Sequence, residues 1–526
     1  MGDLNFSNLD TTKSFGRLSR AAPARISLDP PRIDELEVPA GAELRFNYAA
    51  KAVDRNVVDL LLELGREQQL IEKFRSLATG EVMNPGENRR VLHHLLRGEL
   101  AGPVVANGVD LGAFYVKQRE RCLEFAKRIR SGEIRGSTGK EFRTIVQIGI
   151  GGSDLGPKAL YLALKNARAE IERREDLSAH FISNVDPDDA ADLLSTLNLE
   201  SALFVLVSKS GTTQETLTNY AIVTEAMRNF PKIDPSRHVV AVTSQSSPLA
   251  GSADVLDSFY IDDSIGGRYS STSSVGGCVL ACSLGPDVFR EFLAGAHAAD
   301  QVALDSAPES NAALLDALFG VYEQSLLGYP STAVLPYSQA LSRFPAHLQQ
   351  LDMESNGKRV NRNGEPSGYP TGPVVFGEPG TNGQHSFYQH LHQGTDIVPL
   401  QFIGFKDSQL GVDLLAEGHT SQQKLNANLA AQIVAFAQGK ADTNPNKSFP
   451  GGRPSSLLFG ERLTPRNLGA LLAHFENKIM FQGFAWNINS FDQEGVQLGK
   501  ALAGSLLDAN AEAALMSFGR KMNVVG

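Results

Sequence analysis

The sequence is poor in cysteine and has no apolar run near the length that crosses a membrane. Its three cysteines are odd in number and form no CxxC pair, which argues against a disulfide framework and against a zinc knuckle. A membrane span needs about 20 apolar residues, and the N-terminal segment MGDLNFSNLDTTKSFGRLSR lacks the apolar core of a signal peptide. We therefore expect a protein of the reducing cytoplasm that does not bind membranes.

An excess of basic charge is also missing. The chain carries 49 Lys and Arg residues against 59 Asp and Glu residues, which gives a formal net charge of -10. This balance argues against binding to nucleic acid and favours a small partner. Because 526 residues are too many for one core of ordinary size, we expect two or three domains that share one compact body.

The sequence also lacks histidines with the spacing that metal ligands have. His390 and His392 are two residues apart, so they would leave a helix on different faces, and no HExxH motif occurs. We expect no metal. The histidine that follows the loop GTNGQ, His385, is a better candidate for acid-base chemistry, because loops present functional groups.

A glycine-rich segment at 148–156, IGIGGSDLG, partly matches a dinucleotide-binding fingerprint. Its third glycine comes two residues late, and Asp154 occupies the expected place. We therefore expect no NAD cofactor. The segment instead predicts a glycine turn in which the backbone N–H groups of Gly152 and Ser153 face a ligand.

Short apolar runs recur along the middle of the chain and alternate with helical patterns. One series lies at 144–150, 179–183, 202–207 and 238–242, and a second begins near 331 and continues at 373–376 and 397–405. Such alternation predicts parallel sheets that helices cover on both faces. The expected fold class is α/β, with two αβα sandwich domains.

Both ends of the chain favour helices. Val57, Leu60, Leu61 and Leu64 have the spacing of an amphipathic helix, and the first 115 residues are expected to be mainly helical. The final third is also expected to be helical, and the segment 439–456 reads as a flexible surface loop. Thr464 and Pro465 look like the N-cap and first residue of a helix; its apolar face comprises Leu468, Leu471, Leu472, Phe475 and Ile479.

The segment Val205–Thr216, VLVSKSGTTQET, predicts a phosphate-binding loop. A buried strand leads into serine and threonine hydroxyls, Gly211 allows close approach of the backbone, and the next helix directs its free N–H groups at the site. Thr212 and Glu215 have the spacing of a capping box, which would fix where that helix begins. An ordinary polar turn is the alternative.

Three further segments carry candidate catalytic or binding groups. Arg268 follows two glycines after the strand-like run SFYID, so its guanidinium can approach an oxyanion. Glu354 lies in a last helical turn before Gly357, where it could act as a general base. Near the C-terminus, a helix expected from Ser490 would place Gln493, Gln497 and Lys500 on one face.

Six of these segments resemble, in order and approximate spacing, motifs of the glucose-6-phosphate isomerase family. They are GIGGSDLGP, SKSGTTQET, GGRYS, QLDMESNGK, GEPGTNGQHSFYQHLHQG and FDQEGVQLGK. The resemblance implies a helical extension at 1–115 that packs on the larger domain, a first sugar-isomerase (SIS-type) domain at 116–290, and a second at 291–526 with C-terminal helices. It also implies a homodimer whose active sites lie between subunits.

The resemblance further implies the interconversion of glucose 6-phosphate and fructose 6-phosphate, in glycolysis and gluconeogenesis, without a cofactor. Glu354 would move a proton between C2 and C1, His385 from the partner subunit and Lys500 would help to open the ring, and Arg268 would stabilise the enediolate. The phosphate would be held by Ser208, Lys209, Ser210, Thr213 and Thr216, and the sugar pocket would be lined by Gly152, Ser153, Glu215 and Gln493.

The chain departs from the family pattern in several places. Glu494 stands where tryptophan is common, and Ser210 with Gly211 replaces a bulkier pair. Two alternatives therefore stay open: a sugar-phosphate sensor without turnover, and an isomerase that accepts both glucose and mannose phosphates.

Overall fold

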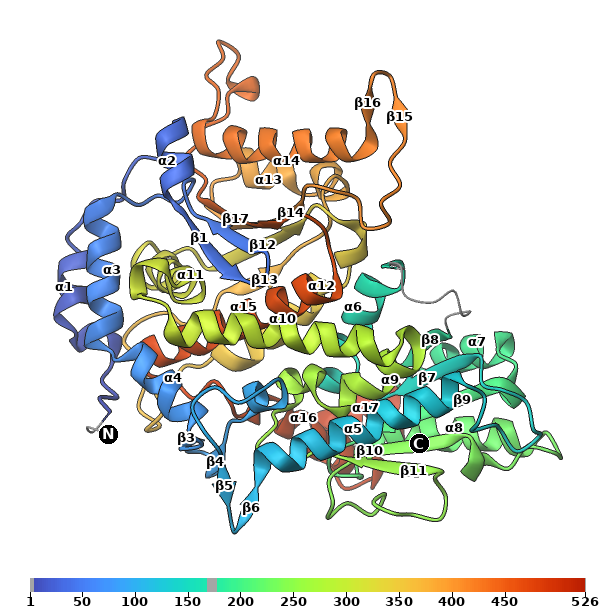
Figure 1. Cartoon of the computed structure of the whole chain (residues 1–526). Coiled ribbons are helices and arrows are strands. Elements are labelled where there is room, and N and C mark those ends of the chain that lie inside the picture. The colour runs from blue at the N-terminus through green and yellow to red at the C-terminus, as the bar shows by residue number, and fades with distance from the viewer. Residues whose placement is uncertain (1–3, 168–176, 526) are drawn as a thin grey trace.

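The structure is a computed structural model that describes residues 4–167 and 177–525. Two β-sheets lie at opposite ends of the body, with the long helices α10 (Pro286–Asp305) and α15 (Pro465–Ala485) between them (Figure 1). Helices cover both faces of each sheet, so the predicted α/β class with two sandwiches is confirmed.

The first sheet is entirely parallel and has the strand order β11-β10-β9-β7-β8. Side chains of a strand alternate between the two faces of a sheet. In β9, Val205 therefore packs towards α5 (Leu111–Arg130) and α9 (Ser274–Leu284), while Phe204 packs towards α7 (Pro187–Thr196) and α8 (Gln214–Arg228). Four strands match the predicted apolar runs: β7 (Thr144–Ile148), β8 (Ser178–Ile182), β9 (Ala202–Val207) and β10 (Val239–Thr243). The fifth, β11 (Asp257–Tyr260), overlaps the strand-like run SFYID.

The second sheet is mixed, with the order β1-β2-β17-β14-β12-β13. Its parallel part contains the predicted strands β12 (Ser331–Pro336), β13 (Val374–Phe376) and β14 (Leu400–Phe405), together with β17 (Ser455–Gly460). The expectation of a mainly helical N-terminal region is wrong here, because β1 (Glu37–Gly41) and β2 (Leu44–Asn47) form an antiparallel hairpin that pairs with β17.

The prediction that 439–456 is a loop throughout is wrong at its end, because Ser455 and the next residue belong to β17. The loop lies at the surface, but it ends where β17 begins. The apolar run of β17 is short and follows a Pro/Gly-rich stretch, so its strand character depends on pairing with β14 on one side and β2 on the other.

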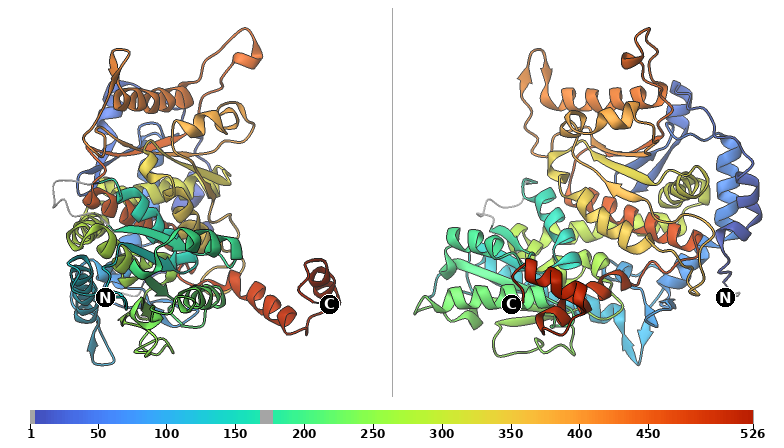
Figure 2. Two further views of the ribbon diagram at one scale, coloured as in Figure 1. Left: turned by 90° about the vertical axis from the view of Figure 1, so that its right-hand side faces the viewer. Right: turned by 180° about the vertical axis from the view of Figure 1, so that it is seen from behind.

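The predicted amphipathic helix is confirmed as α3 (Arg55–Glu67), with Val57, Leu60, Leu61 and Leu64 buried. The two C-terminal helices extend away from the body (Figure 2). The remaining helices are α1 (Lys13–Leu18), α2 (Pro30–Glu35), α4 (Leu70–Ala78), α6 (Leu155–Leu164), α11 (Ala312–Val321), α12 (Phe344–Gln349), α13 (Tyr388–Gln393), α14 (Ser421–Gln438), α16 (Gln497–Leu507) and α17 (Ala513–Lys521). No helix in the described ranges is long and apolar enough to cross a membrane.

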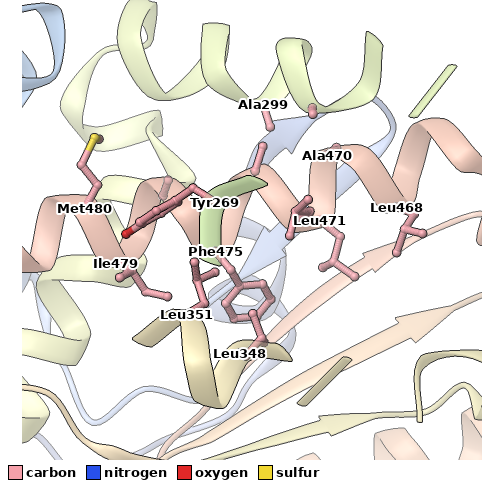
Figure 3. Packing of buried hydrophobic residues seen from close by; sticks show 14 of the residues in the cluster. Tyr269, Ala299, Leu348, Leu351, Leu468, Ala470, Leu471, Phe475, Ile479 and Met480 are labelled. Carbon is pink, nitrogen blue, oxygen red and sulfur yellow. The ribbon is translucent and has the colours of Figure 1, made fainter. Parts of the chain in front are cut away.

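Helix α15 forms the centre of the largest hydrophobic cluster. Its N-cap is Thr464, whose hydroxyl accepts from the N–H of Asn467, and Pro465 is its first residue, as predicted. Figure 3 shows Phe475 of α15 beside Leu348 and Leu351, which belong to the helical segment that carries Glu354. Packing against α15 thus fixes the position of that segment.

The single apolar face predicted for α15 is too narrow, because all of its residues from Asn467 to Ala485 are buried. The charged side chains of its other face are paired inside the protein. Glu476 of α15 makes an ion pair with Arg97, and Arg97 makes a second ion pair, at 3.0 Å, with Asp300 of α10. Burial of a helix on all sides is tolerated only when its charges find such partners.

The division of the chain at 115 and 290 stays a prediction. Helix α5 runs across the first boundary and α10 runs across the second. The units on either side of each boundary therefore share a helix.

Candidate active site

A cavity of about 740 Å³ opens at the carboxyl ends of the strands of the first sheet. Ligands of parallel α/β proteins bind at this edge because strand–helix loops meet there. Its walls come from the loops that follow β7, β9 and β11, from the helical segment 344–356, from the chain after residue 490, and from the hairpin of β3 (Val82–Asn84) and β4 (Arg89–Arg90).

The predicted phosphate loop forms one wall of the cavity, and it is held by its own hydroxyl groups. The Ser208 and Thr213 hydroxyls lie 3.0 Å apart, and the Gly211 N–H donates to the Ser208 hydroxyl over 3.1 Å. Gly211 has φ of +70°, and a Cβ there would lie 2.2 Å from the Ser247 hydroxyl oxygen. The turn therefore requires glycine at this position.

The predicted capping box is wrong. Helix α8 begins at Gln214, its N-cap is Thr213, and no side chain in the described part of the chain caps it. Thr212 instead donates its hydroxyl to the Ser210 hydroxyl, over 2.9 Å. The first N–H groups of a helix have no intrahelical acceptor, so the missing cap leaves donors available for an anion.

Two further residues of this segment bring a hydroxyl and an ammonium group to the cavity. Thr216 lines the cavity, and its hydroxyl is buried without a hydrogen-bond partner among the described residues. The Lys209 ammonium donates to the Ile265 carbonyl over 3.2 Å, and burial lowers the pKa of Lys209 from its usual value. Ser208, Ser210 and Glu215 line the same wall.

The glycine turn after β7 lies against the turn that precedes Arg268. A Cβ on Gly152 would lie 2.2 Å from the backbone of Gly267, so only glycine permits this approach. The prediction that the Ser153 N–H faces a ligand is wrong, because this group donates to the Ile150 carbonyl over 3.1 Å. Both Gly152 and Ser153 nevertheless line the cavity.

Arg268 and Glu354 meet in the cavity. A guanidinium nitrogen of Arg268 lies 3.3 Å from the Glu354 carboxylate. The remaining donors hold the arginine in place: its Nε donates to the Ser355 hydroxyl over 2.7 Å, and its second Nη donates to the carbonyls of Ser490 and Asp492 over 2.6 and 2.8 Å. Arg268 is only 2% exposed, so it is a buried cation aimed at the carboxylate rather than a surface residue.

Glu354 closes a π-helical turn, Gln350–Glu354, that continues α12. The helical segment ends at Asn356 and Gly357 follows it, as predicted. Sequence reasoning missed Gln350, whose side-chain amide donates to the Glu354 carboxylate over 3.1 Å. Its position four residues before Glu354 is the signal that could have identified it, because residues four apart share a helix face.

Gln493, Gln497 and Lys500 all line the cavity. They do not lie on one helix as predicted, because α16 begins only at Gln497 and Gln493 precedes a separate 3-10 turn. The expected helical start at Ser490 is wrong because Ser490 belongs to a buried loop whose carbonyl accepts from Arg268.

His385 is the predicted site residue that the single chain does not bring to the cavity. It lies exposed at the end of the 3-10 turn Asn382–His385. Conversely, Asn84, Arg89 and Arg90 line the cavity but were not predicted, since the hairpin that carries them lies where helix was expected. Within the described ranges, no three His, Cys, Asp or Glu side chains are grouped to bind a metal ion.

Asp352, two residues before Glu354, gives a prediction on pH and stability. Burial raises the pKa of the Asp352 carboxyl from 3.8 to about 6, although Lys478 opposes the shift. The folded state therefore binds the proton more tightly, and this contribution to stability is lost as the pH rises through 6. At pH 8, Asp352→Asn should stabilise the fold by up to about 3 kcal/mol, since one pKa unit is worth about 1.4 kcal/mol.

Thermal unfolding at two pH values checks this expectation. The gain in midpoint temperature should be present at pH 8 and vanish at pH 4, because the wild-type carboxyl is then protonated in the folded state. An equal gain at both pH values would contradict a role for ionisation.

The parallel first sheet and the loop-lined cavity place this chain in the class of α/β proteins that bind small ligands at the carboxyl ends of their strands. The family model for phosphoglucose isomerase matches residues 47–521. The chain therefore belongs to the phosphoglucose isomerase family. A glucose-6-phosphate isomerase from Treponema denticola is 56% identical to it, with 98% of this chain and 99% of the relative covered.

Two further comparisons agree. A glucose-6-phosphate isomerase from Borreliella afzelii is 43% identical, and 99% of each chain is covered. A crystal structure of a glucose-6-phosphate isomerase from Chlamydia trachomatis superimposes with a TM-score of 0.91 at 41% identity, and the match covers 99% of this chain and 100% of that chain. The resemblance found in the six sequence motifs is thereby confirmed.

Proposed function

We propose that this protein interconverts glucose 6-phosphate and fructose 6-phosphate by moving a proton between C2 and C1 of the open-chain sugar. The observation that carries the proposal is the Glu354 carboxylate, which lies 3.3 Å from the buried Arg268 guanidinium in the cavity that also holds the phosphate loop. Two relatives named glucose-6-phosphate isomerase, from Treponema denticola and Treponema pallidum, are each 56% identical over nearly the whole chain.

The chemistry needs a base and a cation, and the cavity offers both. Removing a proton from the carbon next to a carbonyl places negative charge on oxygen, and a preorganised cation stabilises that charge. Glu354 takes the proton from one carbon and returns it to the neighbouring carbon, while Arg268 stabilises the cis-enediolate between the two steps. Aldose and ketose are isomers, so the reaction involves no net oxidation.

The remaining cavity residues hold the substrate. The free N–H groups of the first turn of α8 and the nearby hydroxyls bind the phosphate, which orients the reactive end of the sugar. Lys500 assists at the ring oxygen. We assign Ser208, Lys209, Ser210, Thr213 and Thr216 to the phosphate, and Gly152, Ser153, Glu215 and Gln493 to the sugar.

An assay with fructose 6-phosphate in deuterium oxide tests this proposal. Formation of glucose 6-phosphate with deuterium at C2 is expected, because the base exchanges its proton with solvent. A folded protein that binds the sugar phosphate without turnover or exchange would instead be a sensor. Formation of mannose 6-phosphate as well would show the broader specificity.

We further propose a homodimer in which the partner subunit supplies His385 for ring opening. Support comes from the exposed position of His385 outside the cavity of its own chain. The extended C-terminal segment is a second support, since α16 has no buried residue in the single chain (Figure 2). Such exposed helices with Leu498 and Leu507 on their surface are typical of an interface.

Mixing two inactive variants tests the shared site. Glu354→Gln and His385→Ala dimers, unfolded and refolded together, should regain activity, because each hybrid dimer contains one site with both residues intact. Random assortment makes half of the dimers hybrid, so about one quarter of wild-type activity is expected. If each subunit supplied its own His385, the mixture would stay inactive, as each variant does when refolded alone.

We also propose a cytoplasmic location and the three-part division at 115 and 290. The location is supported by three buried cysteines that are free thiols, of which Cys122 and Cys278 have sulfur atoms 3.2 Å apart. An oxidising compartment would favour a disulfide between such neighbours.

A further inference from the structure

The C-terminal arm, residues 493–525, contributes to the cavity although Gly519 is the one residue in this range that is buried. Helix α16 has no buried residue, and in α17 only Gly519 is buried. The arm extends from the body in Figure 2, yet Gln493 and Lys500 line the cavity. Within one chain, their placement depends on the loop that precedes the arm, residues 489–492, which we call the arm root.

The arm root is tied to the body by charged hydrogen bonds at Asp492. The Lys358 ammonium lies 2.6 Å from one carboxylate oxygen of Asp492, and it also donates to the Asp492 carbonyl over 3.3 Å. The Asn489 amide donates to the second carboxylate oxygen over 2.7 Å. The two charged side chains are about one-fifth exposed, so solvent screens the pair less than it screens a surface pair.

The third donor of Lys358 reaches the helical segment that carries the base. The ammonium donates to the backbone carbonyl of Glu354 over 3.1 Å. Carbonyls in a last helical turn lack intrahelical donors and form the negative end of the helix dipole, so they attract a cation. An ammonium has three N–H donors, and the three acceptors at Lys358 are Glu354, the Asp492 carbonyl and the Asp492 carboxylate.

Arg268, like Lys358, connects Glu354 to the arm root. It faces the Glu354 carboxylate at 3.3 Å and donates to the Asp492 carbonyl over 2.8 Å. The base, the cation beside it and the arm root therefore converge on Asp492. Neither Lys358 nor Asp492 lines the cavity itself, so any effect of the two on catalysis must pass through the groups that they hold.

We infer that Lys358 and Asp492 are positioning residues that set the distance between the base Glu354 and the arm residues Gln493 and Lys500. The inference rests on the proposed isomerase function. The phosphate loop belongs to a different wall of the cavity, so losing the pair should disturb the reacting end of the sugar more than its binding. A misplacement of about 1 Å can cost about 100-fold in rate.

Steady-state kinetics of three variants test the inference. Lys358→Met keeps the aliphatic stem and removes the three donors; we expect kcat to fall by about 10- to 100-fold, with KM within about threefold of the wild type. Lys358→Arg, which keeps the charge, should recover much of kcat. Asp492→Asn keeps the shape and should lose kcat on its own, which provides a second variant if Lys358→Met does not fold.

The double variant Lys358→Met/Asp492→Asn shows whether Lys358 and Asp492 act together or independently. If the two residues act as a pair, the double variant should lose no more kcat than the more impaired single variant, because the effects of coupled residues are not additive. Lys140→Met is the matched control, since Lys140 forms an ion pair with Glu200 away from the cavity. Its kcat should equal that of the wild type.

Three outcomes would overturn the inference. They are an unchanged kcat in folded Lys358→Met or Asp492→Asn, single losses that multiply in the double variant, and a loss that appears equally in Lys140→Met. Each of these leaves the isomerase assignment intact if the wild type turns over. A wild type without turnover would overturn the assignment and the inference together.

Discussion

Replacing Glu354 by Gln should lower kcat by at least about 100-fold, the range that acid-base groups contribute, while leaving substrate binding nearly unchanged. The amide keeps the size of the side chain and can still accept from Gln350, but it cannot take a proton from carbon. Phosphate recognition lies on the other wall of the cavity, so KM should move little. Steady-state kinetics with fructose 6-phosphate, together with deuterium exchange, measure both effects.

The matched control is Glu309→Gln, which changes an exposed glutamate in the turn Pro308–Ser310, away from the cavity. This variant should keep wild-type kinetics. Near-normal turnover by Glu354→Gln would refute the assignment of Glu354 as the base. Loss of turnover with retained exchange would place its role in a later step.

Replacing Arg97 by Met should destabilise the fold by about 3–5 kcal/mol, the range measured when one partner of a buried ion pair is removed. Arg97 holds two carboxylates that have no exposed side-chain surface, Asp300 of α10 and Glu476 of α15. Methionine fills a similar space but removes the guanidinium that pairs with both acids. Thermal and urea unfolding should show a lower midpoint, and less folded protein is expected on expression.

A surface ion pair provides the comparison for Arg97. Arg17 lies 2.5 Å from Glu63, and both side chains are about half exposed. Arg17→Met should change stability by less than about 1 kcal/mol, because water and salt screen such pairs. Similar shifts in the two variants would show that burial does not determine the effect of the Arg97 pairs.

The phosphate loop was predicted from the sequence because its features are local. An apolar strand, a run of hydroxyl residues with one glycine, and a following helix occupy twelve consecutive residues, Val205–Thr216. The capping box was predicted wrongly for the same reason. Its spacing is also local, but in the folded loop the Thr212 hydroxyl donates to the Ser210 hydroxyl and does not cap helix α8.

Several features of the cavity carry no local signal. Nothing around Arg268 indicates that its guanidinium meets the Glu354 carboxylate and the arm root, because these segments are distant in sequence. The hairpin β1–β2 belongs to the second sheet only through its pairing with β17. Short strands of this kind are stable when a neighbour supplies their hydrogen bonds.

The sequence by itself determined the fold class, the strand-helix succession of the first sheet, three strands of the second sheet, and the residue types needed for phosphate binding and proton transfer. Hydrophobic periodicity and turn chemistry are properties of neighbouring residues, so they can be recognised without coordinates. The tertiary structure alone decided which base meets which cation, that α15 is buried on all sides, and that Lys358 joins Glu354 to Asp492. These contacts depend on how distant segments pack, and that packing is a property of the whole folded chain.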